Sequence, residues 1–540
     1  MKPSLAGLFL GISILHGAPI EVSDLRVGHE ESPSGTGVKP RFSWNLVSKD
    51  RGKRQSAYEI LAATSLQKLN VKSADLWRSK KQISPARHLV PWKGKSLQGF
   101  GKVHWKVRVT DEKGGISPWS EPAVFRVDGK SVLPSVDRIS TFESSSAPLN
   151  TLYAKSIATL KKRLTAFQGG DVSALGTGDQ VHRSARAMLY HFNAVPHLTH
   201  WLRLIDKNRT EKKTFTTSPS SKSVASMVSE GAIIAHHPVW WMGGDSAYPG
   251  ERWKIYEDHM VARENNDRAF KGTKWGKASP AEGMTAEFLD LVYLGFSTRL
   301  IRELALPAQQ PMNAIRFQDY AARIRGSFGR QYLKPDGSLS VTSQSAHVTA
   351  LRSAVLKKDQ QGKIIRDLMD SIEKDGVKVG PIGAHFLPGV LSLTGHQEKA
   401  LSLLTELTPE QQKSFIGNGI SEWLMAFLAG IDTTLPGFQR VLISPRIPAD
   451  HSVSWVKASY HSPSGKISVH WRKLEKGGLK VEFTIPAGTI GQINLPSKED
   501  AAIFEGEKKL SEAQGITLVK QDEKMISLAA QSGTYSITIR

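Results

Sequence analysis

The feature that most constrains this chain is the spacing of its apolar residues, which changes twice along the sequence. Apolar residues alternate with polar ones from Val103 to Val109, recur at intervals of three and four from Phe288 to Leu300, and alternate again from Tyr535 to Ile539. Alternation is typical of a strand with one buried face, whereas intervals of three and four are typical of an amphipathic helix. The sequence therefore predicts a sheet region, a helical region and a second sheet region, in that order.

The helical region contains roughly a dozen apolar segments of helical spacing. Breaks between them fall at Gly169-Gly170, Gly243-Gly244, Pro307, Gly376 and Gly395. No fixed repeat period joins the segments, which argues against a solenoid of identical repeats. Helices connected in hairpin pairs are therefore predicted to form a double-layered helical barrel.

Its 540 residues are far more than one hydrophobic core can organise. We expect the following division, based on turn residues and changes of period: a signal peptide at 1–18, a β-sandwich at 20–128, a linker at 129–140, a helical barrel at 141–436 and a C-terminal β-sandwich at 437–540. The architecture that this division predicts is a multidomain protein with sheets at both ends.

Export is predicted from the N-terminal segment. The apolar run from Leu5 to Leu15 follows a single Lys2, and about a dozen residues are too few to span a bilayer. The run is typical of a secretory signal peptide, although cleavage after Ala18 would place His16 where a small residue is preferred. We expect an exported protein, in the periplasm, the cell envelope or outside the cell, without a membrane span.

Charge and cysteine content exclude several kinds of site. Lys and Arg number 72 against 50 Asp and Glu, a formal net charge of +22, but the charge is spread from Lys49 to Lys524 without a dense basic run. This distribution does not favour nucleic-acid binding and suits an anionic polysaccharide or envelope surface. The absence of cysteine excludes disulfides, thiolate metal sites and a cysteine nucleophile.

Short segments spread over nearly the whole chain occur in an order that can be compared with that of a known protein family. They are Arg41–Trp44, Tyr58–Ile60, Asp75–Trp77, His104–Val109, Trp119–Pro122, Thr141–Ser144, Trp201–Arg203, Tyr332–Gly337, Thr342–Gln344, Glu422–Leu424, Ala429–Ile431, Pro436–Phe438, Ser444–Arg446 and Gly465–Trp471. In this order they resemble the bacterial α-L-rhamnosidase family. The resemblance implies a fibronectin type III-like first domain, an (α/α) six-hairpin barrel, and inverting hydrolysis of terminal α-L-rhamnose from glycans or glycosides without a cofactor.

Three departures from the family pattern affect the expected chemistry. No room exists between Phe125–Asp128 and Ser140 for the family's additional carbohydrate-binding β-domain, so a short form is expected. The general-acid Glu of the family falls on or next to Ser173, and the segment carrying its second carboxylate has no counterpart before Gly419. Two functions therefore stay open: a rhamnosidase-like glycoside hydrolase, and a catalytically inactive glycan-binding or scaffolding homologue.

Inverting hydrolysis requires two carboxyl groups on opposite faces of the sugar. We predict Asp171, Asp179 and Glu282 as catalytic candidates, with Glu287 as an alternative to Glu282. Asp179 matches the last residue of the family's Gly-Trp-Thr-Gly-Asp segment and Asp171 lies in the same glycine-rich turn. The structural alternatives are helix capping for Asp179, a turn for Asp171, and the acidic first turn of a helix for Glu282.

A second group of candidates combines aromatic and polar side chains, which suit the apolar faces and hydroxyls of a sugar. His237, Trp240, Trp241, Asp245 and Trp275 are predicted to bind substrate, and both indoles and Asp245 are expected to line the same concavity as Asp179. Core packing of the indoles and a turn role for Asp245 are the alternatives. The neighbouring pair of histidines at 236 and 237 lacks the spacing of a metal pair, so no metal site is predicted.

Overall fold

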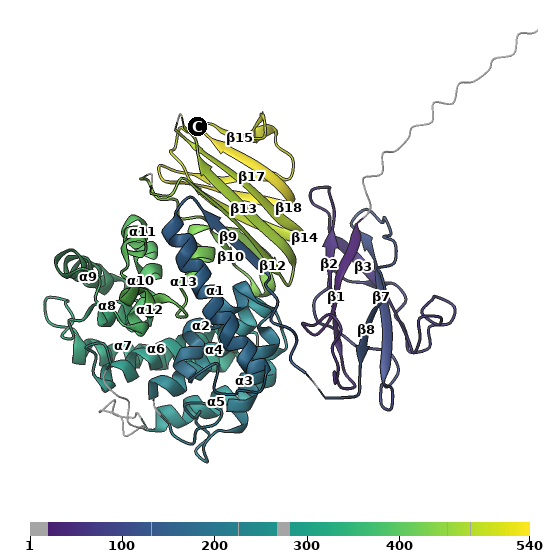
Figure 1. Ribbon diagram of the computed structural model, residues 1–540, viewed down its shortest axis with the longest axis horizontal. Coiled ribbons are helices and arrows are strands. Elements are labelled where there is room, and N and C mark those ends of the chain that lie inside the picture. Colours follow the sequence, from purple (N-terminus) through teal and green to yellow (C-terminus); the bar gives the residue numbers. More distant parts are fainter. Residues whose placement is uncertain (1–19, 131, 225, 267–280, 451, 476) are drawn as a thin grey trace, which may run out of the picture.

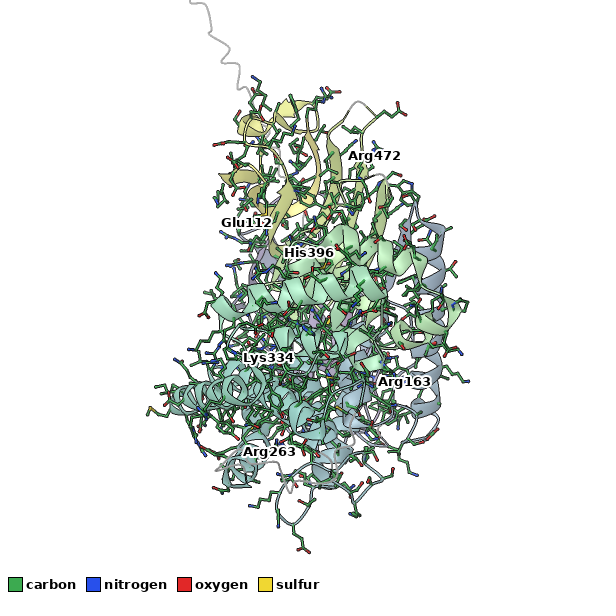
Figure 2. All side chains as sticks on the ribbon, turned by 90° about the vertical axis from the view of Figure 1, so that its left-hand side faces the viewer. Glu112, Arg163, Arg263, Lys334, His396 and Arg472 are labelled. Atoms are coloured by element: carbon green, nitrogen blue, oxygen red, sulfur yellow. The ribbon has the colours of Figure 1, made fainter. Side chains whose placement is uncertain are left out.

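The computed structural model describes residues 20–130, 132–224, 226–266, 281–450, 452–475 and 477–540. Figure 1 shows an N-terminal sheet domain beside a helical domain, with a C-terminal sheet domain packed against the helices. Figure 2, turned by 90°, shows the sheet that carries Arg472 at the opposite end of the molecule from the helices that carry Arg263. The predicted order of sheet, helices and sheet is confirmed.

The N-terminal domain is a β-sandwich of two antiparallel sheets, β1-β2-β6 and β4-β3-β7-β8 with β5 on β3. Its strands are β1 Glu21–Val27, β2 Arg41–Val47, β3 Gln55–Ala63, β4 Trp77–Arg78, β5 Gln82–Ile83, β6 Val90–Pro91, β7 Lys102–Asp111 and β8 Ala123–Arg126. The predicted alternation lies on β7, where Val103, Trp105 and Val107 are buried. Trp105 packs on Phe42 of the other sheet, with ring centroids 4.3 Å apart, so the two faces share one core.

The connection from the sandwich to the barrel is short and contains one strand. β8 ends at Arg126, and the first helix begins at Ala147. Between them β9, Ser140–Ser144, pairs antiparallel with β12, Trp455–Ser462, in the C-terminal sheet. The first residues of the segment expected to form the barrel, from residue 141, thus complete a distant sheet before the helices begin. No separate sheet domain lies here among the described residues.

The helical domain contains the predicted dozen or so helices. They are α1 Ala147–Gln168, α2 Gly178–His191, α3 Val195–Lys207, α4 Ser226–Gly243, α5 Tyr248–Asn266, α6 Ala286–Ala305, α7 Pro311–Tyr332, α8 Gln344–Arg352, α9 Gln361–Asp375, α10 Pro381–Leu393, α11 Gln397–Glu406, α12 Pro409–Phe415 and α13 Ile420–Trp423. The glycines predicted to end helices do so at two C-caps, Gly169 after α1 and Gly376 after α9.

The contacts among these helices form a closed ring. α2, α4, α6, α8, α10 and α13 each contact the next, and α13 contacts α2. The helices between them in the sequence pack outside: α1 on α2, α3 on α4, α5 and α7 on α6, α9 on α8, and α11 on α10. This alternation of inner and outer helices gives six hairpins, as predicted.

The C-terminal domain begins earlier than the expected residue 437. Its strands are β10 Ile431–Thr433, β11 Arg440–Ile443, β12, β13 Gly465–Lys473, β14 Leu479–Pro496, β15 Ile503–Glu505, β16 Lys508–Lys509, β17 Ile516–Gln521 and β18 Met525–Ile539. The three residues of β10 are too few to show a period, which is why the sequence placed the boundary after them. With β9 these strands form one hydrogen-bonded sheet, and a register shift between Ile485 and Ile490 bends the long β14.

Polar contacts join the N-terminal domain to both other domains. Arg51 pairs with Glu505 of β15 at 2.7 Å. His88 Nε2 lies 2.7 Å from the carbonyl of Gly243 at the end of α4, and Arg41 of β2 forms a bidentate pair with Asp245. The sandwich is thereby fixed against the barrel and the C-terminal sheet.

Candidate active site

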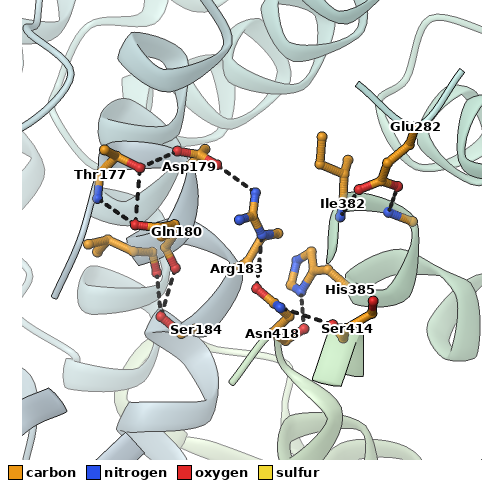
Figure 3. Close-up of polar contacts among 12 residues, drawn as sticks. Thr177, Asp179, Gln180, Arg183, Ser184, Glu282, Ile382, His385, Ser414 and Asn418 are labelled. Carbon is orange, nitrogen blue, oxygen red and sulfur yellow. Dashed lines mark hydrogen bonds and ion pairs between the residues drawn. The ribbon is translucent and has the colours of Figure 1, made fainter. Parts of the chain in front are cut away.

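The N-terminal ends of the inner helices meet at one end of the barrel, which we call the mouth. We define the mouth by Asp179 and Arg183 of α2, Glu282 before α6, the first turn of α10 at Ile382 and Gly383, and Asn418 before α13 (Figure 3). Backbone N–H groups at helix N-termini are free to bind anionic or polar groups. Of the three predicted carboxylates, Asp179 and Glu282 lie here.

Asp179 is buried on the first turn of α2 and accepts hydrogen bonds at both carboxylate oxygens. Oδ1 accepts from the Thr177 hydroxyl at 2.5 Å, and Oδ2 accepts from Arg183 Nη1 at 2.7 Å. The N-cap of α2 is Thr177, whose backbone N–H donates to Gln180 Oε1 at 3.0 Å. Capping therefore does not account for Asp179, whose carboxylate is directed at Arg183.

Arg183 and Tyr293 connect the two carboxylates of the mouth. Arg183 is buried, and its Nε donates to Asn418 Oδ1 at 3.0 Å. Burial raises the pKa of the Tyr293 hydroxyl, the positive charge of Arg183 opposes this rise, and the negative charges of Asp179 and Glu282 add to it. Both carboxylates therefore act on the same buried hydroxyl, although they come from different helical hairpins.

Glu282 has a strained backbone and a fully engaged carboxylate. Its φ of 54° is rare for a residue with a side chain. Oε1 accepts from the N–H of Ile382 at 2.7 Å, and Oε2 accepts from the N–H of Gly383 at 2.9 Å and from the Ser345 hydroxyl at 2.5 Å. A strained residue held by its surroundings is typical of a functional position.

Close backbone approaches fix both carboxylates. A Cβ atom at Gly231 of α4 would lie 2.5 Å from the backbone nitrogen of Asp179, so only glycine lets α4 cross α2 at this depth. A Cβ atom at Gly380 would lie 2.5 Å from the carboxyl carbon of Glu282. Two glycines therefore set the positions of the two acidic side chains.

The other predicted site residues lie away from the mouth. Asp171 is exposed in the loop before α2, where it accepts from the backbone N–H and hydroxyl of Ser173, which lower its pKa. Trp275 lies outside the described residues. Glu287, the alternative to Glu282, is on the first turn of α6, as its helix-terminal interpretation predicted.

His237 and Trp241 line a cavity inside the barrel, which we call the barrel cavity. Its volume is about 300 Å³ and it is enclosed by α2, α4, α6, α8, α10, α13 and β10. Asp179 is not among its lining residues, and Trp240 is buried in the core beside Trp241. The expectation of one concavity shared by both indoles, Asp245 and Asp179 is wrong, because consecutive residues of a helix face different directions.

Sequence reasoning missed the charged residues of the barrel cavity. Arg186 of α2 pairs with Glu422 of α13 at 3.1 Å and with Asp432 of β10 at 2.6 Å. Burial raises the pKa of Glu422, and Arg186 opposes this rise. The only signal in the sequence was the segment Glu422–Leu424, which carried the family resemblance without a role attached to its acid.

Asp245 holds the N-terminal domain rather than a sugar. Its two oxygens accept from Arg41 Nη1 at 2.7 Å and from Nη2 at 2.6 Å, and it borders a separate cavity of about 190 Å³ between the domains together with His29. The partner of Asp245 is 204 positions away in the sequence, so no local pattern could have predicted the pair.

Replacing Asp245 with asparagine should weaken this domain contact and leave turnover unchanged. Because the Arg41 side chain is one-third exposed, we expect the loss to be about 1 kcal/mol in the free energy of unfolding. Urea denaturation followed by tryptophan fluorescence measures it. A large rise in KM for a sugar substrate with unchanged stability would contradict the assignment of Asp245 as a domain contact.

Two further properties of the described residues bear on function. No group of three or more His, Asp or Glu side chains in the described part of the chain is arranged to hold a metal ion. Among the helices of the same residues, none combines the length and apolar character needed to cross a membrane.

Three family models match successive parts of the chain. An N-terminal immunoglobulin domain of the Rha78A-like type matches residues 22–128. The bacterial alpha-L-rhamnosidase 6 hairpin glycosidase domain matches residues 137–420, and the bacterial alpha-L-rhamnosidase C-terminal domain matches residues 430–510. The middle match alone covers more than half of the chain.

Curated proteins match a shorter part of the chain. An alpha-L-rhamnosidase of Formosa agariphila is 43% identical over 88 residues, which are 16% of this chain and 9% of that protein. An alpha-L-rhamnosidase of Streptomyces avermitilis is 37% identical over 105 residues, 19% of this chain and 10% of that protein. The matched segments thus span about a tenth of these relatives.

Solved structures match over almost the whole chain. The alpha-L-rhamnosidase of Dictyoglumus thermophilum superposes with a TM-score of 0.83 at 12% identity, covering 97% of this chain and 100% of that one. The Streptomyces avermitilis enzyme complexed with L-rhamnose gives 0.81 at 12% identity, covering 96% and 100%. At this level of identity the likeness establishes the fold.

Proposed function

The chain belongs to the bacterial α-L-rhamnosidase family with a six-hairpin glycosidase domain, and from this premise we propose that it hydrolyses terminal α-L-rhamnose from glycans or glycosides. The family supports the reaction class, since the match covers more than half of the chain. The substrate follows from the same match: a rhamnose-containing oligosaccharide, polysaccharide or glycoside. Export of the protein stays a prediction from the apolar segment Leu5–Leu15.

The observation that carries the proposal is the convergence of Asp179 and Glu282 at the mouth. Each carboxylate is fixed by hydrogen bonds, and both act electrostatically on Tyr293. Glycoside hydrolysis with inversion uses two carboxyl groups, one to protonate the leaving oxygen and one to activate water. At the mouth, acidic residues from two hairpins lie at the N-terminal ends of the inner helices, where free backbone N–H groups are available.

We assign the two carboxylates different tasks. Asp179 accepts hydrogen bonds from Thr177 and Arg183 on both oxygens, which suits a negatively charged acceptor that orients a sugar hydroxyl or the attacking water. Glu282 is the second carboxylate that the reaction requires. Its strained backbone and its three hydrogen bonds hold it in one position beside α10, as preorganised catalysis demands.

The stereochemistry of the product tests this proposal. The purified protein should release the aglycone from an aryl α-L-rhamnoside, and proton NMR should show β-L-rhamnose as the first-formed anomer, because water attacks the face opposite the leaving group. First formation of the α-anomer would contradict the inverting mechanism. Saturable binding of rhamnose without turnover would contradict hydrolysis and identify a glycan-binding homologue.

A further inference from the structure

The barrel cavity contains residues to which the proposed reaction gives no part. At about 300 Å³ it has the size of the smaller ligand sites of proteins. It is distinct from the mouth: Asp179 and Glu282 do not line it, and its walls include the end of α8 at Arg352 and strand β10 at Asp432.

One wall of the barrel cavity is aromatic. The Trp241 and His237 rings are stacked, with centroids 5.8 Å apart and planes 17° apart. Phe296 and Phe386 lie on the same lining, with centroids 6.0 Å apart. Flat aromatic faces of this kind bind the apolar face of a ring-shaped ligand.

Three arginines also line the cavity, and two of them are neutralised by acidic neighbours. Arg186 pairs with Glu422 and Asp432, and Arg299 pairs with Glu303 at 3.0 Å. Because Arg186 and Arg299 are both paired with acidic side chains, neither leaves a large unbalanced charge on the lining.

Arg352 is different. It has no hydrogen bond or ion pair within the described part of the chain, although it lines the cavity on the last turn of α8. Its guanidinium is charged at neutral pH, as arginine is throughout the physiological range. The Arg352 side chain is exposed to solvent, so its guanidinium is free to donate hydrogen bonds to a ligand in the cavity.

We propose that the barrel cavity binds a sugar acid, with the carboxylate of the ligand on the guanidinium of Arg352 and its ring against Trp241. A planar guanidinium donates two parallel hydrogen bonds to a carboxylate. A neutral sugar would leave Arg352 unpaired, and a phosphate ion would leave the aromatic wall uncovered. A uronic acid supplies both a carboxylate for Arg352 and a ring for Trp241 within the available volume.

The net charge of the chain supports an acidic ligand. With 72 basic and 50 acidic residues, the protein as a whole attracts anions. The cavity is also linked to the mouth indirectly. His385 lines the cavity and its Nδ1 donates to the carbonyl of Asn418 at 3.0 Å, and the Asn418 side chain accepts from Arg183.

Calorimetric titration tests the site with four probes: D-glucuronate, D-glucose, acetate and inorganic phosphate. We expect saturable binding of glucuronate, and at least tenfold weaker binding of the other three, since each lacks either the carboxylate or the ring. Arg352→Met should weaken glucuronate binding at least tenfold, and Arg352→Lys should weaken it less, because charge is kept while the bidentate geometry is lost.

The control variant is Arg302→Met, which removes an exposed arginine of α6 outside the cavity and should bind glucuronate as the wild type does. Thermal melting confirms folding; Arg352→Met should melt no lower than the wild type, because it removes an unpaired cation. Arg352→Met should turn over the aryl rhamnoside as the wild type does. Because glucuronate binding is measured without turnover, it tests the site even if the proposed hydrolysis fails. Unchanged glucuronate binding in Arg352→Met, or equal binding of phosphate or glucose, would overturn the proposal.

Discussion

The Asp179→Asn variant should hydrolyse an aryl α-L-rhamnoside at least about a hundred times more slowly than the wild type, the loss typical of a positioned acid–base group. Asparagine keeps the shape of the side chain and one acceptor oxygen, but it removes the negative charge that faces Arg183 across 2.7 Å. The measurement is kcat/KM from release of the aryl alcohol.

The same substitution should also cost stability. Because Thr177 is the N-cap of α2, the helix start is unaffected by the change. The Asp179–Arg183 pair is buried, with both side chains about nine-tenths covered, so a neutral partner leaves a buried guanidinium poorly compensated. We expect a loss of about 1–3 kcal/mol in the free energy of unfolding, and rates should be compared at a temperature where both proteins are fully folded.

Asp171→Asn is the matched control, since it makes the same chemical change in the loop that precedes α2. Asp171 is exposed and its carboxylate bonds groups of its own loop, chiefly Ser173, so both rate and stability should stay near wild-type values. Glu282→Gln should also reduce the rate of hydrolysis, because it removes the second carboxylate of the mouth. Full activity of both Asp179→Asn and Glu282→Gln would place the chemistry elsewhere.

The domain order could be predicted from the sequence because it depends on local spacing. Alternation on β7 and helical spacing on α6 are properties of short segments, and the breaks at Gly169 and Gly376 are single residues with their own conformational preference. The position of β9 could not be predicted, because five residues join a sheet whose nearest strand lies more than three hundred positions later.

The candidate site was only partly predictable for the same reason. Asp179 was found because it ends a family segment, but its partner Arg183 and the shared hydroxyl of Tyr293 depend on packing between α2 and α6. The three predicted site residues of α4, His237, Trp240 and Trp241, could not all face one concavity, since a helix turns neighbouring residues to different sides. Trp240 entered the core, whereas Trp241 reached the barrel cavity.

A buried charge cluster at the base of the helical domain carries the second large effect. Glu230 of α4 is completely buried, and its Oε1 lies 2.8 Å from Arg263 Nε and 3.1 Å from His259 Nε2. Arg263 of α5 also pairs with Asp290 of α6 at 2.7 Å. Burial raises the pKa of Glu230, but His259 and Arg263 outweigh it, and the pKa is lowered. The cluster therefore joins three consecutive helices through buried charges.

Glu230→Gln should lower the free energy of unfolding by about 3–5 kcal/mol, because removing one member of a buried ion pair leaves the other charge uncompensated. Urea denaturation at neutral pH measures this loss. Glu264→Gln on the same helix as Arg263 is the control: its partners Arg316 and Arg323 are substantially exposed, so its loss should stay below about 1 kcal/mol.

Acidification should reduce the difference between Glu230→Gln and the wild type. A carboxyl group whose pKa is lowered by folding stabilises the native state above its unfolded pKa, about 4.3 for glutamate, and this contribution is lost as the pH falls through the folded value. The two proteins should therefore differ most at neutral pH and approach each other below about pH 4. A difference that is constant from pH 7 to pH 3 would show that the glutamine acts through packing, and that the ion pairs of Glu230 contribute little to the stability of the barrel.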